Sequence, residues 1–427
     1  MVSRLKKVSL GIHAGRAGRS LRKIAKALDM ERMVSEDSPE EDLSGGAIPR
    51  GDNVEALQQR QKLLENQGID ISWLKKELYP TELVKGNIEN YTGIAKIPIG
   101  LAGPMLINGE HAKGSFFIPI ATTEGTLVAS YNRGMKVIRE SGGCTTRVWN
   151  QGMQRAPVFH FANLVEAAGF SDWIRNNKED LAKFTATTSG RVSMKDVEIH
   201  NIGRNVYLRF TFNTGDAAGQ NMANKAAFVV CKYIEKAYPG KIEGYWLEGN
   251  IATDKKYSKL NVLSTRGKRV SAEVDISRET LKQVLRTSPE SLLSIYTDGT
   301  LGSFYAGSNT NGAHAANALA ALFIACGQDV ANIAESSTSL VDLRASPRGI
   351  YVSVTLPSLI VGVMGGGTGL PTQKECLDIL GCKGTGGALK FAEICAATVL
   401  AGELTLAGAI TAEEWAEAHE KMGRNRE

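Results

Sequence analysis

The sequence predicts an α+β protein in which one domain is inserted into another. Two observations predict this class: strand-like segments with alternating apolar residues are mixed with long helical stripes, and this pattern changes in mid-chain. The chain has 427 residues, 43% hydrophobic and 22% charged, which is ordinary for a globular protein with large cores. The net charge of +5 is mild for this length and does not indicate nucleic-acid binding.

A small helical region is expected at the N-terminus, over residues 1–86. Its first 26 residues hold many Lys and Arg and no Asp or Glu. Such a run belongs either to a transit peptide or to a solvated basic helix face, and the second is the more common case. Residues 35–52 are rich in Gly, Pro and acidic residues and predict a linker. Apolar residues at helical spacing then predict one amphipathic helix over residues 53–68.

One long helix and four strands are predicted in the middle of the chain. Residues 122–140 carry one apolar stripe, and Gly142 and Gly143 end the predicted helix. Residues 205–212 alternate apolar with polar residues, the period of a half-buried strand. The three further predicted strands cover residues 241–247, 269–276 and 350–356.

The pattern between residues 156 and 247 changes to helix, strand, helix and separates the polar motifs described below. We therefore predict an inserted domain at 156–247 within a large domain formed by 87–155 and 248–410. Residues 392–410 are strongly apolar but carry Glu393 and Glu403, which favours a buried core helix over a membrane span. The six cysteines are scattered without a C-x-x-C pair, as expected for free thiols in a reducing cytosol.

Four polar stretches, far apart in the chain, each place a proton-handling group among small residues. An ammonium holds a developing alkoxide, a carboxyl group delivers a proton and an imidazole protonates a leaving group, so the set suits carbonyl reduction. The four residues are Glu124, Lys255, Asp329 and His419. Each group also has an ordinary structural explanation. Glu124 would complement a helix dipole and Lys255 would lie on a solvated turn. Asp329 would be an N-cap, and His419 would belong to a solvated tail.

Two glycine-containing segments are candidates for binding a cofactor. No G-x-G-x-x-G follows a predicted strand, so these candidates do not rest on a Rossmann fingerprint. Instead, residues 214–221 join a predicted strand to a helix whose free N–H groups suit a pyrophosphate. Residues 365–368, Gly-Gly-Gly-Thr, form either a tight turn or a second cofactor loop. Ser189 and Arg191 suit a 2′-phosphate, because a guanidinium fork matches that group.

These motifs resemble class I 3-hydroxy-3-methylglutaryl-CoA reductase (HMG-CoA reductase), in its soluble archaeal or bacterial form, from about Glu89 to His419. The matching segments are E-N-x-x-G at 89–93, P-x-G-x-A-G-P at 98–104, T-T-E-G-x-L-V-A-S-x-N-R-G at 122–134 and G-G-G-T at 365–368. The resemblance implies a large catalytic domain built round a central helix, with an inserted ferredoxin-like domain that binds NADP. It also implies a mobile C-terminal tail over residues 411–427.

The implied reaction is the reduction of HMG-CoA to mevalonate and CoA with two NADPH and no metal. The resemblance implies that Lys255 stabilises the alkoxide and that Glu124 donates a proton. It also implies that Asp329 tunes both of these residues and that His419 protonates the CoA thiolate. Implied substrate contacts are Glu89, Ser130, Arg133, Arg155, Asp254, Lys256 and Asn317. Implied cofactor contacts are Ser189, Arg191, Asp216, Gly219, Asn221, Gly365, Gly366, Gly367 and Thr368. A cytoplasmic homodimer or larger homo-oligomer with shared active sites is implied, without membrane or nucleic-acid partners.

The chain departs from the family pattern at several positions. Glu248 stands where the family usually has Ser and would repel a substrate carboxylate, whereas Lys259 would compensate for it. Gly312 replaces an Asn, Ala218 and Gln220 replace two Met, and Arg191 lies one place later than the usual Arg. Two alternatives therefore stay open: a reductase of another branched acyl-CoA, and a cofactor-binding relative without turnover. The choice between NADPH and NADH, and between dimer and tetramer, also stays open.

Overall fold

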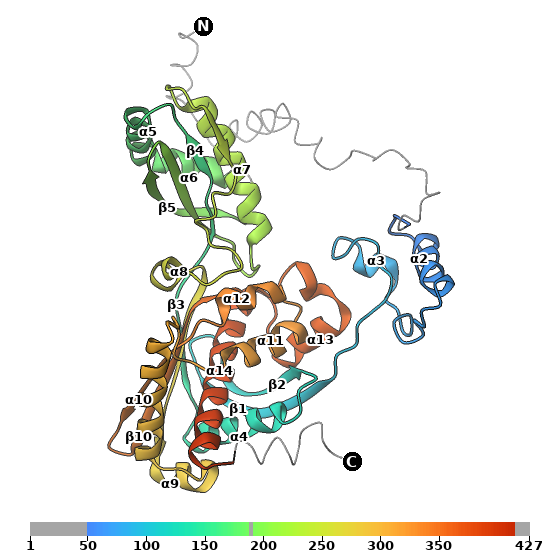
Figure 1. Cartoon of the computed structure of the whole chain (residues 1–427), viewed down its shortest axis with the longest axis vertical. Coiled ribbons are helices and arrows are strands. Elements are labelled where there is room, and N and C mark those ends of the chain that lie inside the picture. Colours follow the sequence, from blue (N-terminus) through green and yellow to red (C-terminus); the bar gives the residue numbers. More distant parts are fainter. Residues whose placement is uncertain (1–48, 188–190, 415–427) are drawn as a thin grey trace.

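The computed structural model describes residues 49–187 and 191–414. These residues form a mixed helix and sheet structure with two main bodies and a small helical part at the side (Figure 1). In Figure 1 the upper body contains α5, α6 and α7, and the lower body contains α4 and α9 to α14. The prediction of an α+β fold is confirmed, because every strand pair in both sheets is antiparallel.

The large body is built around α14 (Gly387–Thr411), whose small and apolar residues are buried on all sides. Among the described residues it is the one helix long and apolar enough to cross a membrane, yet 67% of its apolar window is buried. Its two carboxylates accept backbone N–H groups: Glu393 from His111 and Ala112, and Glu403 from Ala313 and His314, just before α11 (Ala315–Ala325). The predicted buried core helix is therefore confirmed.

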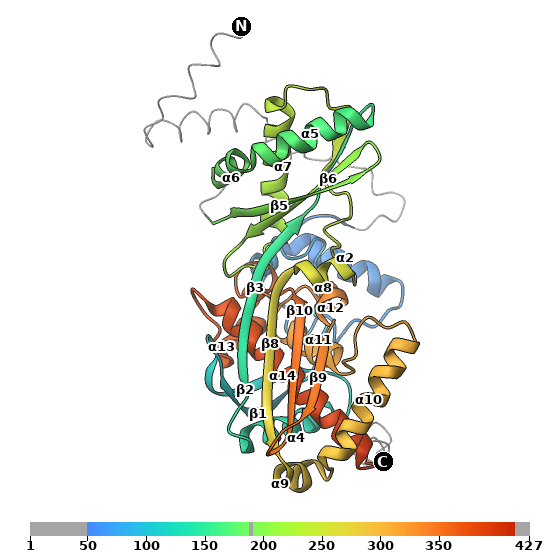
Figure 2. The ribbon, with the colours of Figure 1, turned by 90° about the vertical axis from the view of Figure 1, so that its left-hand side faces the viewer.

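One long antiparallel sheet joins the two bodies, with the strand order β7-β4-β6-β3-β8-β10-β9 and β5 paired to β6. The joining strand is β3 (Thr145–Arg155), which runs from the lower body into the upper one (Figure 2). Its first part pairs with β8 (Gly267–Ser277), and its last three residues pair with β6 (Asn205–Asn213). The upper body thus begins inside β3.

The upper body has its own hydrophobic core, separate from that of the large body. Its sheet has the order β7-β4-β6-β5, with both helical segments leading between strands. Chain order is one strand, two helices, two strands, one helix and one strand. These elements are β4 (Val158–His160), α5 (Leu164–Asn176), α6 (Lys178–Ala186), β5 (Ser193–Ile202), β6, α7 (Gln220–Ala237) and β7 (Gly244–Trp246).

The side part contains α2 (Val54–Asn66) and α3 (Thr81–Val84) around a small core of Leu57, Val84 and Tyr91. Asn53 caps α2 through its side chain, which confirms the amphipathic helix predicted there. The predictions for the basic N-terminus and for most of the linker fall on residues 1–48, outside the described residues.

The remaining elements belong to the large body or to its junction with the upper one. They are β1 (Ile99–Asn108), β2 (Lys113–Ala121), α4 (Leu127–Glu140), α8 (Lys259–Ser264), α9 (Arg278–Thr280), η4 (Leu281–Leu285), α10 (Pro289–Tyr305), η5 (Val330–Asn332), α12 (Ile333–Ser336), β9 (Leu340–Ala345), β10 (Gly349–Leu359), η6 (Gly366–Gly369) and α13 (Pro371–Ile379).

Two predicted boundaries are wrong. The helix predicted from residue 122 begins only at Leu127, because Thr126 has a left-handed φ of 74°. Glu124 therefore lies in the turn before the helix, where its N–H donates to the Thr122 hydroxyl at 2.9 Å. The strand predicted at 241–247 is reduced to β7, whereas β6, β8 and β10 confirm the other three predictions.

Candidate active site

A cavity of about 810 Å³ lies where the two bodies meet. Its wall combines the start of α7, the loop before α8, the turn after α11 and the glycine loop after β10. These segments are far apart in the sequence and come together through the long sheet. Ten predicted site residues line the cavity: Arg155, Gly219, Asn221, Asp254, Lys255, Asp329, Gly365, Gly366, Gly367 and Thr368.

The central feature of the cavity is the ion pair between Lys255 and Asp329. Lys255 Nζ lies 3.0 Å from Asp329 Oδ2, and the side chains are 46% and 40% exposed. An exposed pair of this kind contributes little to stability, and it holds an ammonium at the cavity wall. Asp329 also caps η5 by accepting the Ala331 N–H at 3.1 Å. Asp329 is therefore both the N-cap of η5 and the ion-pair partner of Lys255.

Lys255 sits in a strained loop. Asn250, Thr253 and Lys255 have φ values of 65°, 55° and 56°, a region that residues with a side chain rarely occupy. Such strain persists only where the surrounding structure holds it, and it concentrates at functional sites. Here the Lys255 N–H donates to Glu335 Oε1 at 3.2 Å, which fixes the backbone that presents the ammonium.

The fully buried guanidinium of Arg266 supports this loop through its contacts with Asp254 and Glu335. Its Nη2 lies 2.7 Å from Asp254 Oδ1, its Nε lies 3.6 Å from Glu335 Oε1, and its Nη1 donates to the Gln154 carbonyl at 2.8 Å. Burial opposes the ionisation of Asp254, but the charge and hydrogen bond of Arg266, together with the charges of Arg155 and Lys255, outweigh it and hold the pKa of Asp254 below its usual value. Burial raises the pKa of the fully buried Glu335, and the hydrogen bond from Lys255 offsets part of that rise.

Two amides extend the network toward the upper body. Gln220, at the start of α7, donates to Asp254 Oδ1 at 3.2 Å and to Asn332 Oδ1 at 3.0 Å. Asn332 in turn donates to Glu335 Oε1 at 3.0 Å. The sequence analysis did not assign Arg266, Asn332 or Glu335 to the site, because each lies outside the short motifs and becomes part of it only through packing.

The glycine segments of the cavity touch one another closely. A Cβ on Gly327 would come within 2.3 Å of the Gly367 carbonyl oxygen, and φ there is +67°. Asp216 does not line the cavity: its carboxylate accepts the Gly386 and Ala388 N–H groups at 3.0 and 2.9 Å, at the start of α14. It therefore anchors the loop before α7 to the large body instead of facing the cavity.

Several predicted residues are not brought to this cavity. Glu124, Glu89 and Arg191 are exposed outside its lining, and Ser130 and Asn317 are half-buried on α4 and α11. Lys256 is exposed and donates to Asn250 Oδ1 at 2.7 Å. Ser189 and His419 lie outside the described residues.

The residue that departs from the family pattern, Glu248, pairs with a predicted substrate ligand. Arg155 Nη1 lies 3.1 Å from Glu248 Oε2 and 3.8 Å from Asp254 Oδ2. The guanidinium of Arg155 is thus already neutralised by two carboxylates. Lys259, expected to compensate for Glu248, is exposed at the start of α8 and does not line the cavity.

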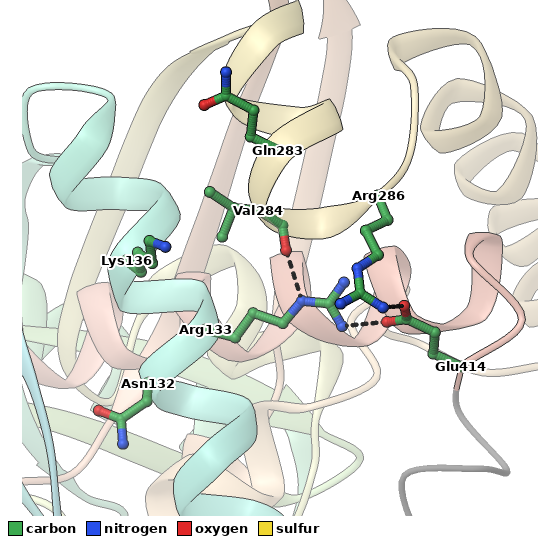
Figure 3. A pocket seen from close by; sticks show the side chains of 7 residues that line it. All are labelled: Asn132, Arg133, Lys136, Gln283, Val284, Arg286 and Glu414. Atoms are coloured by element: carbon green, nitrogen blue, oxygen red, sulfur yellow. Dashed lines mark hydrogen bonds and ion pairs between the residues drawn. The ribbon is translucent and has the colours of Figure 1, made fainter.

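A second, basic pocket of about 460 Å³ lies on the large body between α4 and η4 (Figure 3). Arg133 crosses it and donates to the Val284 and Leu285 carbonyls at 3.0 and 2.7 Å. Three cations and one carboxylate line it, so it suits an anionic ligand. The lining residues are Asn132, Arg133, Lys136, Gln283, Val284, Arg286 and Glu414. Of the cations, the sequence analysis assigned Arg133 and missed Lys136 and Arg286.

An ammonium held by a carboxylate, beside glycine loops where the two bodies meet, suits the active site of an oxidoreductase. Residues 56–424 match the family described as hydroxymethylglutaryl-coenzyme A reductase. The chain belongs to this family, which confirms the family resemblance found in the sequence.

Relatives from archaea are similar over most of their length. A 3-hydroxy-3-methylglutaryl-coenzyme A reductase of Aeropyrum pernix is 44% identical, covering 87% of this chain and 90% of the relative. The protein of the same name from Pyrococcus abyssi is 42% identical, covering 88% and 94%. The solved class II enzyme of Streptococcus pneumoniae bound to NADPH aligns with a TM-score of 0.64 at 20% identity, covering 83% of this chain and 96% of that one. At that identity the solved structure bears on the fold alone.

Proposed function

We propose that this protein reduces HMG-CoA to mevalonate and CoA with two NADPH, in the cytoplasm, as a step of isoprenoid precursor synthesis. The observation that carries the proposal is the Lys255–Asp329 pair at 3.0 Å on a cavity that also contains both glycine segments. The names of the relatives at 40–44% identity support the substrate. We assign the chain to class I on the motifs of its sequence.

The residues of the cavity fit a nicotinamide dinucleotide, which supplies the hydride when bound. Gly365 and Gly366 have left-handed φ values of 80° and 58°, and no atom of the described residues lies within 4 Å of where a Cβ would be. This loop therefore leaves room for a ligand to approach its backbone. On the same cavity, the first turn of α7 has N–H groups without an intrahelical partner, which suit a pyrophosphate. The strand order β7-β4-β6-β5 supports a ferredoxin-like dinucleotide-binding domain, on which Ser189 and Arg191 would take the 2′-phosphate.

Lys255 would carry the chemistry at the thioester oxygen. Its ammonium donates to this oxygen and holds the negative charge that develops when hydride reaches the carbonyl carbon. Asp329, 3.0 Å away, orients the ammonium. The carbon–sulfur bond of the resulting hemithioacetal then breaks, and His419 protonates the departing CoA sulfur. A second hydride reduces the aldehyde, and Glu124 supplies the proton to its oxygen.

The position of Glu124 supports a homo-oligomer with shared sites. This carboxylate is exposed and lies outside the cavity that contains Lys255 and Asp329. We propose that a second copy of the chain brings its Glu124 to the cavity. Glu89 and Asn317 would contact the substrate in the same assembled site, together with Ser130.

The basic pocket would hold the phosphate-bearing end of CoA. Arg133 projects into it from α4, the helix that follows Glu124, and Lys136 adds a charge one turn later. Guanidinium groups form bidentate bonds with phosphates, so Arg133 and Arg286 suit this ligand.

A second candidate substrate is a branched acyl-CoA without a terminal carboxylate. The specific observation is the 3.1 Å pair of Arg155 with Glu248, because this pair occupies the cation that a substrate carboxylate would use. Turnover of HMG-CoA against an uncharged acyl-CoA of the same size distinguishes the two candidates. Absence of NADPH oxidation with either thioester would indicate a cofactor-binding relative without turnover.

The central test follows NADPH oxidation by the purified protein with HMG-CoA. Replacing Lys255 by Ala is expected to lower kcat by about a thousandfold, because the charge on the reacting oxygen loses its counter-ion. Lys183→Ala, at an exposed position on α6, removes the same charge and serves as the control. Turnover by Lys255→Ala within tenfold of the wild type would refute the role assigned to this ammonium.

A further inference from the structure

The basic pocket contains one carboxylate of the protein itself, that of Glu414, which lies just after the end of α14 (Figure 3). Glu414 Oε2 accepts from Arg133 Nη1 at 2.9 Å, and Glu414 Oε1 accepts from Arg286 Nη1 at 2.5 Å. Figure 3 shows the carboxylate facing both guanidinium groups at once. Glu414 thus uses the donors that an anionic ligand of this pocket would need.

The pocket does not depend on Glu414 for its shape. Arg133 is held by two carbonyls of η4, through Nε and Nη2, and these bonds involve different donor atoms from the one that reaches Glu414. Arg286 is 74% exposed and has a left-handed φ of 57°, at the end of η4. Removing the carboxylate of Glu414 would therefore leave Arg133 in place, with its Nη1 donor open to a ligand.

The charges that line the pocket predict whether Glu414 raises or lowers its affinity for an anionic ligand. With Glu414 in the pocket, three cations face one carboxylate; without it, all three face the ligand. A phosphate that enters must either displace Glu414 or lie beside a like charge, and both lower its affinity. The two ion pairs are partly exposed, so each opposes the ligand only moderately.

We propose that Glu414 is an internal competitor for the phosphate groups of the acyl-CoA: it occupies Arg133 and Arg286 in the free protein and leaves them when CoA binds. The residue thereby sets the affinity for the CoA end of the substrate without touching the reacting atoms. This inference rests on the proposed function in one respect, namely that the anionic ligand is CoA.

The test compares Glu414→Gln with Glu413→Gln. Glu413 is the exposed neighbour, so its replacement changes the net charge equally but leaves the pocket unchanged. Calorimetric titration with CoA itself is expected to show a Kd about fivefold lower for Glu414→Gln and unchanged for Glu413→Gln. The KM for HMG-CoA should fall similarly, whereas the KM for NADPH should not change. Glu414→Ala, with the same expectation, serves as a second variant if the first does not fold.

A thioester of the same acyl group on pantetheine, which lacks the nucleotide and its phosphates, locates the effect. The KM for this shorter substrate is expected to be equal in wild type and Glu414→Gln. A Kd for CoA that is unchanged or higher in Glu414→Gln overturns the proposal, and so does an equal gain with the pantetheine substrate. Absence of CoA binding in every variant overturns it together with the CoA assignment. HMG-CoA turnover with unchanged CoA affinity overturns the competitor role alone.

Discussion

Replacement of Arg266 by Met tests the support beneath the reactive loop. Arg266 is fully buried, and Met has a similar length without the charge. The change removes three contacts at once: the 2.7 Å pair with Asp254, the 3.6 Å approach to Glu335 and the hydrogen bond to the Gln154 carbonyl. It leaves two carboxylates without their common counter-ion, one of them fully buried.

The expected loss of unfolding free energy at neutral pH is about 4 kcal/mol, because removing one partner of a buried ion pair typically costs 3–5 kcal/mol. Two features keep the loss from being larger. Glu335 retains hydrogen bonds from the Lys255 N–H and the Asn332 amide, and Asp254 is partly exposed to water. The exposed pair of Arg344 with Asp342 on β9 provides the control, since Arg344→Met should cost less than about 1 kcal/mol.

The loss should depend on pH with a defined sign. A carboxyl group whose folded pKa is depressed adds stability above its unfolded pKa and loses it as the pH falls through the folded value. Asp254 does this in the wild type because Arg266 lowers its pKa. Without Arg266, burial raises the pKa of Glu335 further, and Asp254 loses the two largest contributions that lower its pKa, with the Arg155 and Lys255 charges remaining. The variant therefore regains stability as the pH falls, and its deficit should shrink from about pH 7 to about pH 5.

Urea unfolding followed by circular dichroism, at both pH values and for all three proteins, measures these differences. A deficit for Arg266→Met below about 1 kcal/mol at neutral pH would show that the buried guanidinium is not what holds the loop. A deficit that stays constant between the two pH values would contradict the assigned cause of the Asp254 and Glu335 pKa shifts.

Two further predictions concern the core. Gly134→Ala should lower the unfolding free energy by about 3 kcal/mol, since its Cβ would come within 2.0 Å of the Ala401 carbonyl oxygen where α4 crosses α14. Gly299→Ala, which meets open space in α10, should instead raise it by about 0.5–1 kcal/mol, and equal thermal melting shifts for the two would refute the close crossing. Burial lowers the pKa of Lys268 to about 8, so the unfolded chain keeps a proton that the folded chain releases, and this residue contributes stability that rises with pH from about 8 to 10. Burial raises the pKa values of the six cysteines, which contribute in the opposite direction. Guanidinium unfolding of the wild type and of Lys268→Met isolates the lysine: the stability of the wild type relative to the variant should rise over this range, and a constant difference would disprove the shift.

The strands β6, β8 and β10 and the buried helix α14 were predictable because their patterns are local. Alternating apolar residues identify a half-buried strand without knowledge of its partners, and a helix that is apolar on every side must be buried. The start of α4 was not predictable in the same way. Thr126 takes a left-handed φ that its residue type does not favour, so the turn containing Glu124 separates from the helix.

The candidate site likewise contains residues that local motifs identified and residues that only the fold brought to it. Lys255, Asp329 and the glycine loop were identifiable because reactive and small residues stand next to each other in short motifs. Arg266, Glu335 and Lys136 stand in segments with no such marker, and they contribute through contacts between residues distant in the chain. Asp216 shows the converse: its motif pointed to the cofactor, but its oxygens cap α14.

Short-range patterns in this chain thus predicted three of its strands, the buried helix and the candidate reactive groups. Only the folded arrangement decided which charges meet: the pairing of Lys255 with Asp329, of Arg155 with Glu248, and of Glu414 with the basic pocket. The reason is physical. Electrostatic interactions depend on distance and burial in three dimensions, and neither quantity can be read from separations along a sequence.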